Sequence, residues 1–219
     1  MSHQITPPQT QPMMPGNRFS PAPPIAASQL VKHKQRVISN FGNIQSVHIP
    51  HDWRGYERCY VEMGPRIFLQ LNAPNKSISL KLALRTSSIG KESRFALSQL
   101  LCRKPARNRA EILLPWEIRS VREVLANVGL NQYSIPGNYA FFLSHAATIM
   151  INNRTLLEIY GSFVNRDQKV LSTYRGCFWD SDGLGNIQEI FIEAPPEEFA
   201  STKLILKEVL NSIVWKTRG

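Results

Sequence analysis

The chain has 219 residues, a formal net charge of +10 at pH 7 and a hydrophobic content of 42%. This length fits a single domain with an appendage. The composition excludes a wholly disordered chain, a collagen and a coiled coil. No apolar run reaches the roughly 18–20 residues that a membrane-spanning helix needs.

The first 27 residues are rich in proline and contain no acidic residue. Such a segment buries too little apolar surface to offset its ordering entropy, so residues 1–27 are predicted to be a disordered tail and residues 28–219 a single domain. The start of the chain lacks the apolar stretch of a secretory signal. The three cysteines, Cys59, Cys102 and Cys177, form neither a disulfide framework nor a CxxC metal site. We therefore predict a cytoplasmic location.

The first predicted elements are short. A helix is expected from Ser28, a favourable N-cap, through Val37. A weak strand follows at residues 44–49. Apolar and polar residues then alternate over residues 67–71 and, more regularly, over residues 77–85, which predicts two half-buried strands.

Two helices are predicted in the middle of the chain. The first begins at Ser93, carries Phe95 in its apolar set and stops before Pro105, because proline disrupts a helix interior. The second runs from Pro115 to a C-cap at Gly129, with apolar residues at helical spacing.

Four strands and a helix complete the predicted fold. The strands, joined by short turns, favour an antiparallel meander and cover residues 139–151, 156–164, 170–179 and 187–193. The closing helix begins at Pro195-Pro196 and has a single apolar stripe. The sequence therefore predicts an α+β fold in which helices pack on the faces of an antiparallel sheet, an αβα sandwich.

Motifs for cofactors and metals are incomplete. Gly90-Lys91-Glu92-Ser93 lacks the upstream glycine of a phosphate-binding loop and the Ser or Thr that must follow the lysine. Residues 178–189 place acids at three positions of a calcium loop, but Phe178 stands where the first carboxylate is required. His48 and His51 project to opposite sides of a strand, which disfavours a zinc or iron site. We predict no metal and no cofactor.

No catalytic constellation is visible. The sequence has no Gly-x-Ser-x-Gly elbow, and Cys177 lies among large apolar residues, where a packed thiol is expected. We predict that the protein is not an enzyme, with a site assembled from residues distant in sequence as the remaining alternative.

Residues 91–109 hold the strongest local charge, with six basic residues against Glu92 and a net charge of +5. The candidate binding residues are Lys91, Arg94, Arg103, Lys104, Arg107 and Arg109. They could contact an acidic protein face, phosphates or anionic lipid, or form a solvated connector. Stacking aromatics do not alternate with the arginines, so an acidic protein partner is preferred to nucleic acid.

Two segments carry a family resemblance. Residues 47–53 form a strand followed by Pro-x-x-Trp, and residues 187–215 form a strand ending in Glu193-Ala194-Pro195, a helix with Phe199, and a closing segment at Trp215. These segments resemble the opening and closing parts of the PsbP-like fold, which photosystem II extrinsic subunits, DcrB lipoproteins and a Ran-binding import factor share. The resemblance implies an αβα sandwich used as a non-enzymatic accessory or binding module, and it carries over no functional residue.

Together these features predict a protein-binding module, an adaptor or an accessory subunit of a larger assembly. The alternative is a protein that binds nucleic acid or another anionic surface through the tail and the 91–109 segment, with an affinity that falls steeply with salt.

Overall fold

The computed structural model describes residues 35–60, 66–85, 89–106, 109–125, 139–183 and 185–217. The chain divides into two units, Met1–Lys32 and His33–Gly219, and the description below concerns the second. The predicted tail, and the predicted boundary after residue 27, lie outside the described residues.

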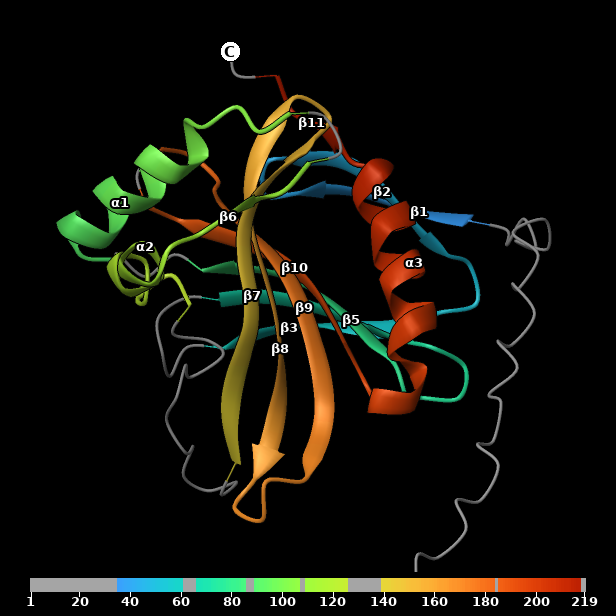
Figure 1. The fold of residues 1–219 in the computed structure, drawn as a ribbon. Coiled ribbons are helices and arrows are strands. Elements are labelled where there is room, and N and C mark those ends of the chain that lie inside the picture. The colour runs from blue at the N-terminus through green and yellow to red at the C-terminus, as the bar shows by residue number, and fades with distance from the viewer. Residues whose placement is uncertain are drawn as a thin grey trace, which may run out of the picture. The chain divides into compact units, whose positions relative to one another are not determined.

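The described residues contain strands and helices in an α+β arrangement (Figure 1). The strands are β1 Gln35–Phe41, β2 Ile44–Pro50, β3 Arg54–Tyr60, β4 Arg66–Asn72, β5 Ser79–Arg85, β6 Glu111–Ile112, β7 Tyr139–Ile151, β8 Arg154–Asn165, β9 Val170–Asp180, β10 Ile187–Ala194 and β11 Val214–Trp215. The helices are α1 Lys91–Leu101, α2 Pro115–Ser120, the 3-10 turn η3 Pro196–Glu198 and α3 Phe199–Asn211. The predicted α+β class with antiparallel pairing is confirmed.

The strands form two sheets. The larger has eight strands in the order β3-β4-β5-β10-β9-β8-β7-β6, and the smaller has the order β1-β2-β11. The strand pairs in both sheets are antiparallel, and β7 to β10 are neighbours in chain order. Short turns allow this arrangement: Asn152 and Asn153, between β7 and β8, both have positive φ.

Two expectations for the N-terminal part are wrong. Residues 35–37, predicted to end a helix, begin strand β1, because they pair with β2 through a turn that contains Gly42 at φ +54°. The strand predicted at residues 44–49 is confirmed as β2, but it belongs to a separate small sheet and not to the single sheet that the sequence predicted. Its second partner is β11, from the far end of the chain, which no local pattern reveals.

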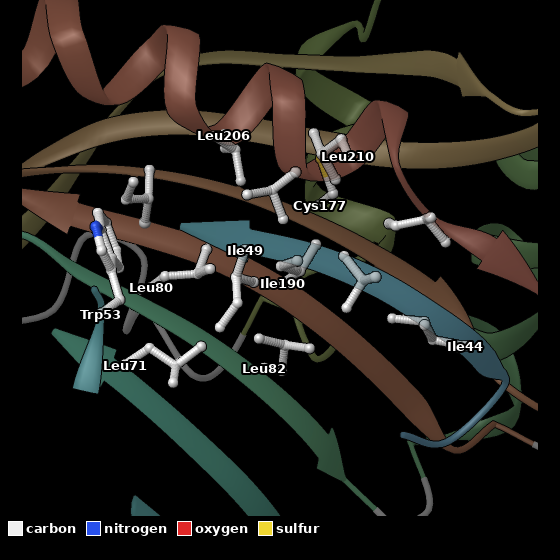
Figure 2. Packing of buried hydrophobic residues seen from close by; sticks show 14 of the residues in the cluster. Ile44, Ile49, Trp53, Leu71, Leu80, Leu82, Cys177, Ile190, Leu206 and Leu210 are labelled. Carbon is white, nitrogen blue, oxygen red and sulfur yellow. The ribbon is translucent and has the colours of Figure 1, made fainter. Parts of the chain in front are cut away.

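One hydrophobic core lies between the large sheet, strand β2 and helix α3. Alternate residues of β9 and β10 point into it, among them Cys177 and Ile190. Figure 2 shows Leu206 and Leu210 of α3 directed toward Ile49 and Ile190. This core fixes α3 and the small sheet on one face of the large sheet.

A second core lies on the opposite face. The intervening residues of the same strands, among them Phe178 and Phe191, pack with Leu97 of α1 and with Val121 and Leu125. The helix predicted from residue 115 ends earlier than expected, and its predicted C-cap, Gly129, lies outside the described residues. Helix α2 ends at Ser120, and residues 121–125 form turns that bury their apolar side chains.

Candidate binding surfaces

The residues predicted to bind a partner lie on and around the α1–α2 layer, defined here as residues 89–106 and 109–125. Lys91, Lys104 and Arg109 are exposed. Arg94 is half-buried, and its Cδ lies 3.0 Å from the position that a Cβ on Gly185 would occupy, so its aliphatic stem packs over that glycine. Arg107 lies outside the described residues.

Arg103 is held inside the layer by two carboxylates. Its guanidinium forms ion pairs with Glu117 and, at 3.2 Å, with Glu111. The Thr155 hydroxyl of β8 also donates to the Arg103 carbonyl at 2.6 Å. Arg103 therefore joins the end of α1 to β6 and α2, and its charge is offset by acids that follow the 91–109 segment in the sequence.

Glu117 is arranged to receive Arg103. Its carboxylate also accepts the Leu114 N–H at 2.7 Å, at the start of α2. Burial alone raises the pKa of Glu117, but the Leu114 hydrogen bond and the Arg103 guanidinium outweigh it, so the pKa is lowered. The ionised carboxylate thus fixes the entry into α2.

The layer also exposes large apolar side chains. Phe95 of α1 is 67% exposed and Trp116 of α2 is 60% exposed. The prediction that counted Phe95 with the apolar face of its helix is wrong. Ser93, Leu97 and Leu100 define the buried side of α1, and their spacing turns Phe95 away from it. Ile112 and Leu114, near the sheet edge at β6, are exposed as well.

The exposure of Trp116 and Phe95 was not predicted from the sequence. The sequence did contain a signal, because Trp116 follows Pro115 at a predicted helix start. In the structure, the short helix α2 buries none of its residues. Exposed aromatic residues beside basic ones are typical of protein interfaces.

The other motifs have structural roles. The Asp180 carboxylate accepts backbone N–H groups from Asp182, Gly183 and Gly185 at 2.7–3.2 Å, which closes the β9–β10 turn. His48 Nδ1 lies 2.9 Å from Gln35 Oε1 on the neighbouring strand. Within the part of the chain that the structure describes, no three His, Cys, Asp or Glu residues are grouped to hold a metal.

Two interior groups have raised pKa values. Burial raises the pKa of Cys177 well above its usual range, and the Glu158 carboxylate adds to the effect. Burial likewise raises the pKa of Tyr174, with a further contribution from Glu189. Both groups are protonated at neutral pH, so Cys177 has the properties of a packed thiol rather than a nucleophile.

No protein-family model matches the sequence, and no curated protein matches it. Solved structures do match this chain. The solution structure of cyanobacterial PsbP (CyanoP) from Synechocystis sp. PCC 6803 matches with a TM-score of 0.50 and 8% identity, over 87% of this chain and 97% of that chain. The fold is PsbP-like. LpqN, described as involved in cell envelope biogenesis of Mycobacterium tuberculosis, matches with a TM-score of 0.39 and 10% identity, over 84% of this chain and 91% of LpqN.

The predicted cytoplasmic location is contradicted. The finding that stands against it is the match to the structure of cyanobacterial PsbP (CyanoP). Among the described residues, no helix has the length and apolar character needed to cross a membrane.

Proposed function

We propose that this protein is a non-enzymatic binding module, an accessory subunit of a larger assembly, whose α1–α2 layer contacts an acidic surface of a partner protein. The PsbP-like fold supports the general architecture, and the residues of the layer support the mode of contact.

The observation that carries the proposal is the exposure of Phe95 and Trp116 among basic side chains. Isolated exposed apolar residues are ordinary, but large aromatic residues on a surface are enriched at contacts with other proteins. Trp116 lies on the short helix α2, which buries no residue of its own. The side chain of Trp116 therefore contributes little to the cores and is available as an anchor.

The charge around these aromatics favours an acidic partner. The exposed basic residues of the layer are Lys91, Lys104, Arg109, Arg119 and Arg122. Its exposed acids are Glu92, Glu111 and Glu123, of which Glu111 pairs with Arg103 and Glu123 accepts the Gly90 N–H at 2.7 Å. The layer thus presents more accessible positive than negative charge, which steers an acidic surface toward it.

The experiment compares tagged full-length variants in cells of the source organism. One variant carries Phe95→Ala and Trp116→Ala, a second carries Lys91→Glu, Lys104→Glu and Arg109→Glu, and Leu204→Ala on α3 is the matched exposed control. We expect a partner protein that co-purifies with the unchanged chain and the control, and at least tenfold less of it with each of the other two variants.

Equal recovery of the partner with all variants would overturn the proposal. So would a co-purifying nucleic acid, or binding to anionic vesicles, that the charge-reversal variant abolishes while no protein partner is lost. Added salt should weaken the protein contact moderately, because a few exposed charge pairs contribute to it.

A further inference from the structure

Among the residues that the structure describes, the α3 side of the large sheet is only partly covered. Helix α3 has its most extensive sheet contacts with β10 and β2, η3 contacts β9, and Phe199 of α3 also stacks on Tyr160 of β8. Figure 1 shows α3 beside β10 and β5, and none of the described helices lies in front of the lower parts of β7 and β8. This uncovered area is called the open floor below.

Strand register identifies the residues of the open floor. Cys177 of β9 belongs to the α3-side core and pairs with Glu158 of β8. Arg175 lies two residues from Cys177, and Tyr160 lies two residues from Glu158. Both therefore face the α3 side as well. His145 is the partner of Tyr160 on β7, and Phe142 is the partner of Ser162. The floor residues are Phe142, His145, Tyr160, Ser162 and Arg175.

These side chains are accessible. Phe142 is 49% exposed, and the other four are half-buried. Phe199 of α3 reaches this area, where its ring stacks on Tyr160 with centroids 4.8 Å apart. Arg175 Nε donates to Glu158 at 2.8 Å, so this buried carboxylate already balances the charge of the guanidinium. The floor itself is therefore aromatic and close to neutral.

The wall beside the floor is basic. Phe199, Lys203 and Lys207 follow one another at four-residue spacing, which places them along one side of α3. Because Phe199 stacks on Tyr160, this is the side that faces the floor. Both lysines are exposed. Glu198, the acid before Phe199, points instead to Asn75, whose Nδ2 lies 3.5 Å from its Oε1, while the exposed Glu208 follows Lys207 directly in the sequence.

We propose that the open floor binds an acidic amphipathic helix of a partner protein, lying beside α3 on strands β7 and β8. Two neighbouring strands span about 10 Å, at 4.7–4.9 Å each. Packed helices lie about 8–10 Å apart, so one more helix fits next to α3. Its apolar side would cover Phe142 and Tyr160, and its acids would reach Lys203 and Lys207. This site is separate from the α1–α2 layer and does not depend on the proposed function.

The test uses a fluorescein-labelled, 18-residue helical peptide of Leu, Ala and Glu with one leucine stripe, and the full-length chain. Fluorescence anisotropy should show saturable binding. Phe142→Glu should weaken it at least tenfold, and Lys203→Glu combined with Lys207→Glu should do the same. Leu204→Glu, on the exposed side of α3 away from the core, is the matched control and should leave the affinity within twofold.

Three results would overturn the inference. One is no binding of the acidic peptide. Another is equal binding of a peptide in which Lys replaces every Glu. The third is loss of binding on Lys91→Glu and Lys104→Glu with no effect of Phe142→Glu, which would assign the peptide to the α1–α2 layer and leave the proposed function standing. A cross-link would also overturn the inference. If a photoreactive residue at position 142 cross-links to residues 1–34 of the same chain, the chain's own segment occupies the floor.

Discussion

The side chain of Gln188, on β10, bonds to both ends of the β1–β2 turn, at Phe41 and at Asn43. Gln188 Oε1 accepts the Asn43 N–H at 2.9 Å, and Gln188 Nε2 donates to the Phe41 carbonyl at 2.8 Å. Asn43 in turn accepts the Trp179 indole N–H at 2.8 Å. These bonds connect the small sheet to the large sheet across 145 residues of sequence.

Replacing Gln188 with Ala should destabilise the fold by about 3 kcal/mol, because the Asn43 N–H and the Phe41 carbonyl would lose their buried partner. Urea unfolding followed by tryptophan fluorescence measures the change. Gln45→Ala, at an exposed position of β2, is the control and should change the free energy of unfolding by about 0.5 kcal/mol or less. Similar values for the two variants would show that the bonds of Gln188 add no stability.

Arg103→Ala should lower the free energy of unfolding by about 1 kcal/mol at pH 7. The effect is modest because Arg103 and Glu117 are only partly shielded from water. The lowered pKa of Glu117 sets the pH dependence of this cost. The ordinary unfolded value is about 4.3, so the contribution is complete above that pH and is lost as the pH falls through the folded-state value.

The measurement is the difference in unfolding free energy between the unchanged chain and Arg103→Ala at pH 7 and at pH 3.5. Arg103→Lys keeps the charge but not the paired donors, and should recover part of the loss. A difference that does not shrink in acid would assign the effect to packing rather than to the ion pair.

Alkaline pH should destabilise the fold through Cys177. Its pKa is raised in the folded chain, whereas an exposed thiol ionises near pH 8.5. Below that pH both states are protonated. Above it only the unfolded state loses its proton, so stability falls as the pH rises. Between pH 8.5 and 9.5 the loss should be about 1 kcal/mol.

Cys177→Ala should remove this part of the pH dependence, although burial of a smaller side chain lowers the stability at every pH. Cys102→Ala is the matched control, because Cys102 is exposed and its removal should leave the alkaline slope unchanged. An unaltered slope in Cys177→Ala would contradict the prediction. Tyr174, with its raised pKa, should add a second decline above about pH 10.

Phe95→Ala and Trp116→Ala should each leave the free energy of unfolding within about 0.5 kcal/mol of the unchanged chain, since both side chains are exposed. Thermal or urea unfolding checks this. Leu97→Ala, a buried neighbour on α1, should cost about 2–5 kcal/mol in the same experiment. A large loss for either aromatic variant would mean that the residue serves the fold rather than a partner.

Local sequence pattern determined much of the fold. Alternation over residues 77–85 predicted β5, and the four segments between residues 139 and 193 correspond to β7 to β10. The closing helix was predicted from its proline start and its apolar stripe, and α3 buries Leu206, Val209 and Leu210 as that stripe requires. These elements follow the sequence because period 2 and period 3.6 place apolar residues on one face without reference to the rest of the chain.

The basic composition of the predicted binding segment could also be predicted from the sequence. Which of its basic residues form ion pairs could not. Six basic residues between positions 91 and 109 are a property of the sequence. That Arg103 is paired with Glu111 and Glu117 depends on how the chain returns through β6 to α2. Phe95 looked like a core residue until the packing of Leu97 and Leu100 set the buried side of α1.

The sequence by itself determined an α+β chain with a net positive charge and the elements whose periodicity is local. Only the tertiary structure decided that β2 pairs with β11 from the opposite end of the chain, that Gln188 closes the β1–β2 turn, and that Phe199 of α3 stacks on Tyr160 of β8. The reason is physical. Pairing between distant segments depends on which surfaces bury each other best in three dimensions, and that information is spread over the whole chain rather than written in any one segment of it.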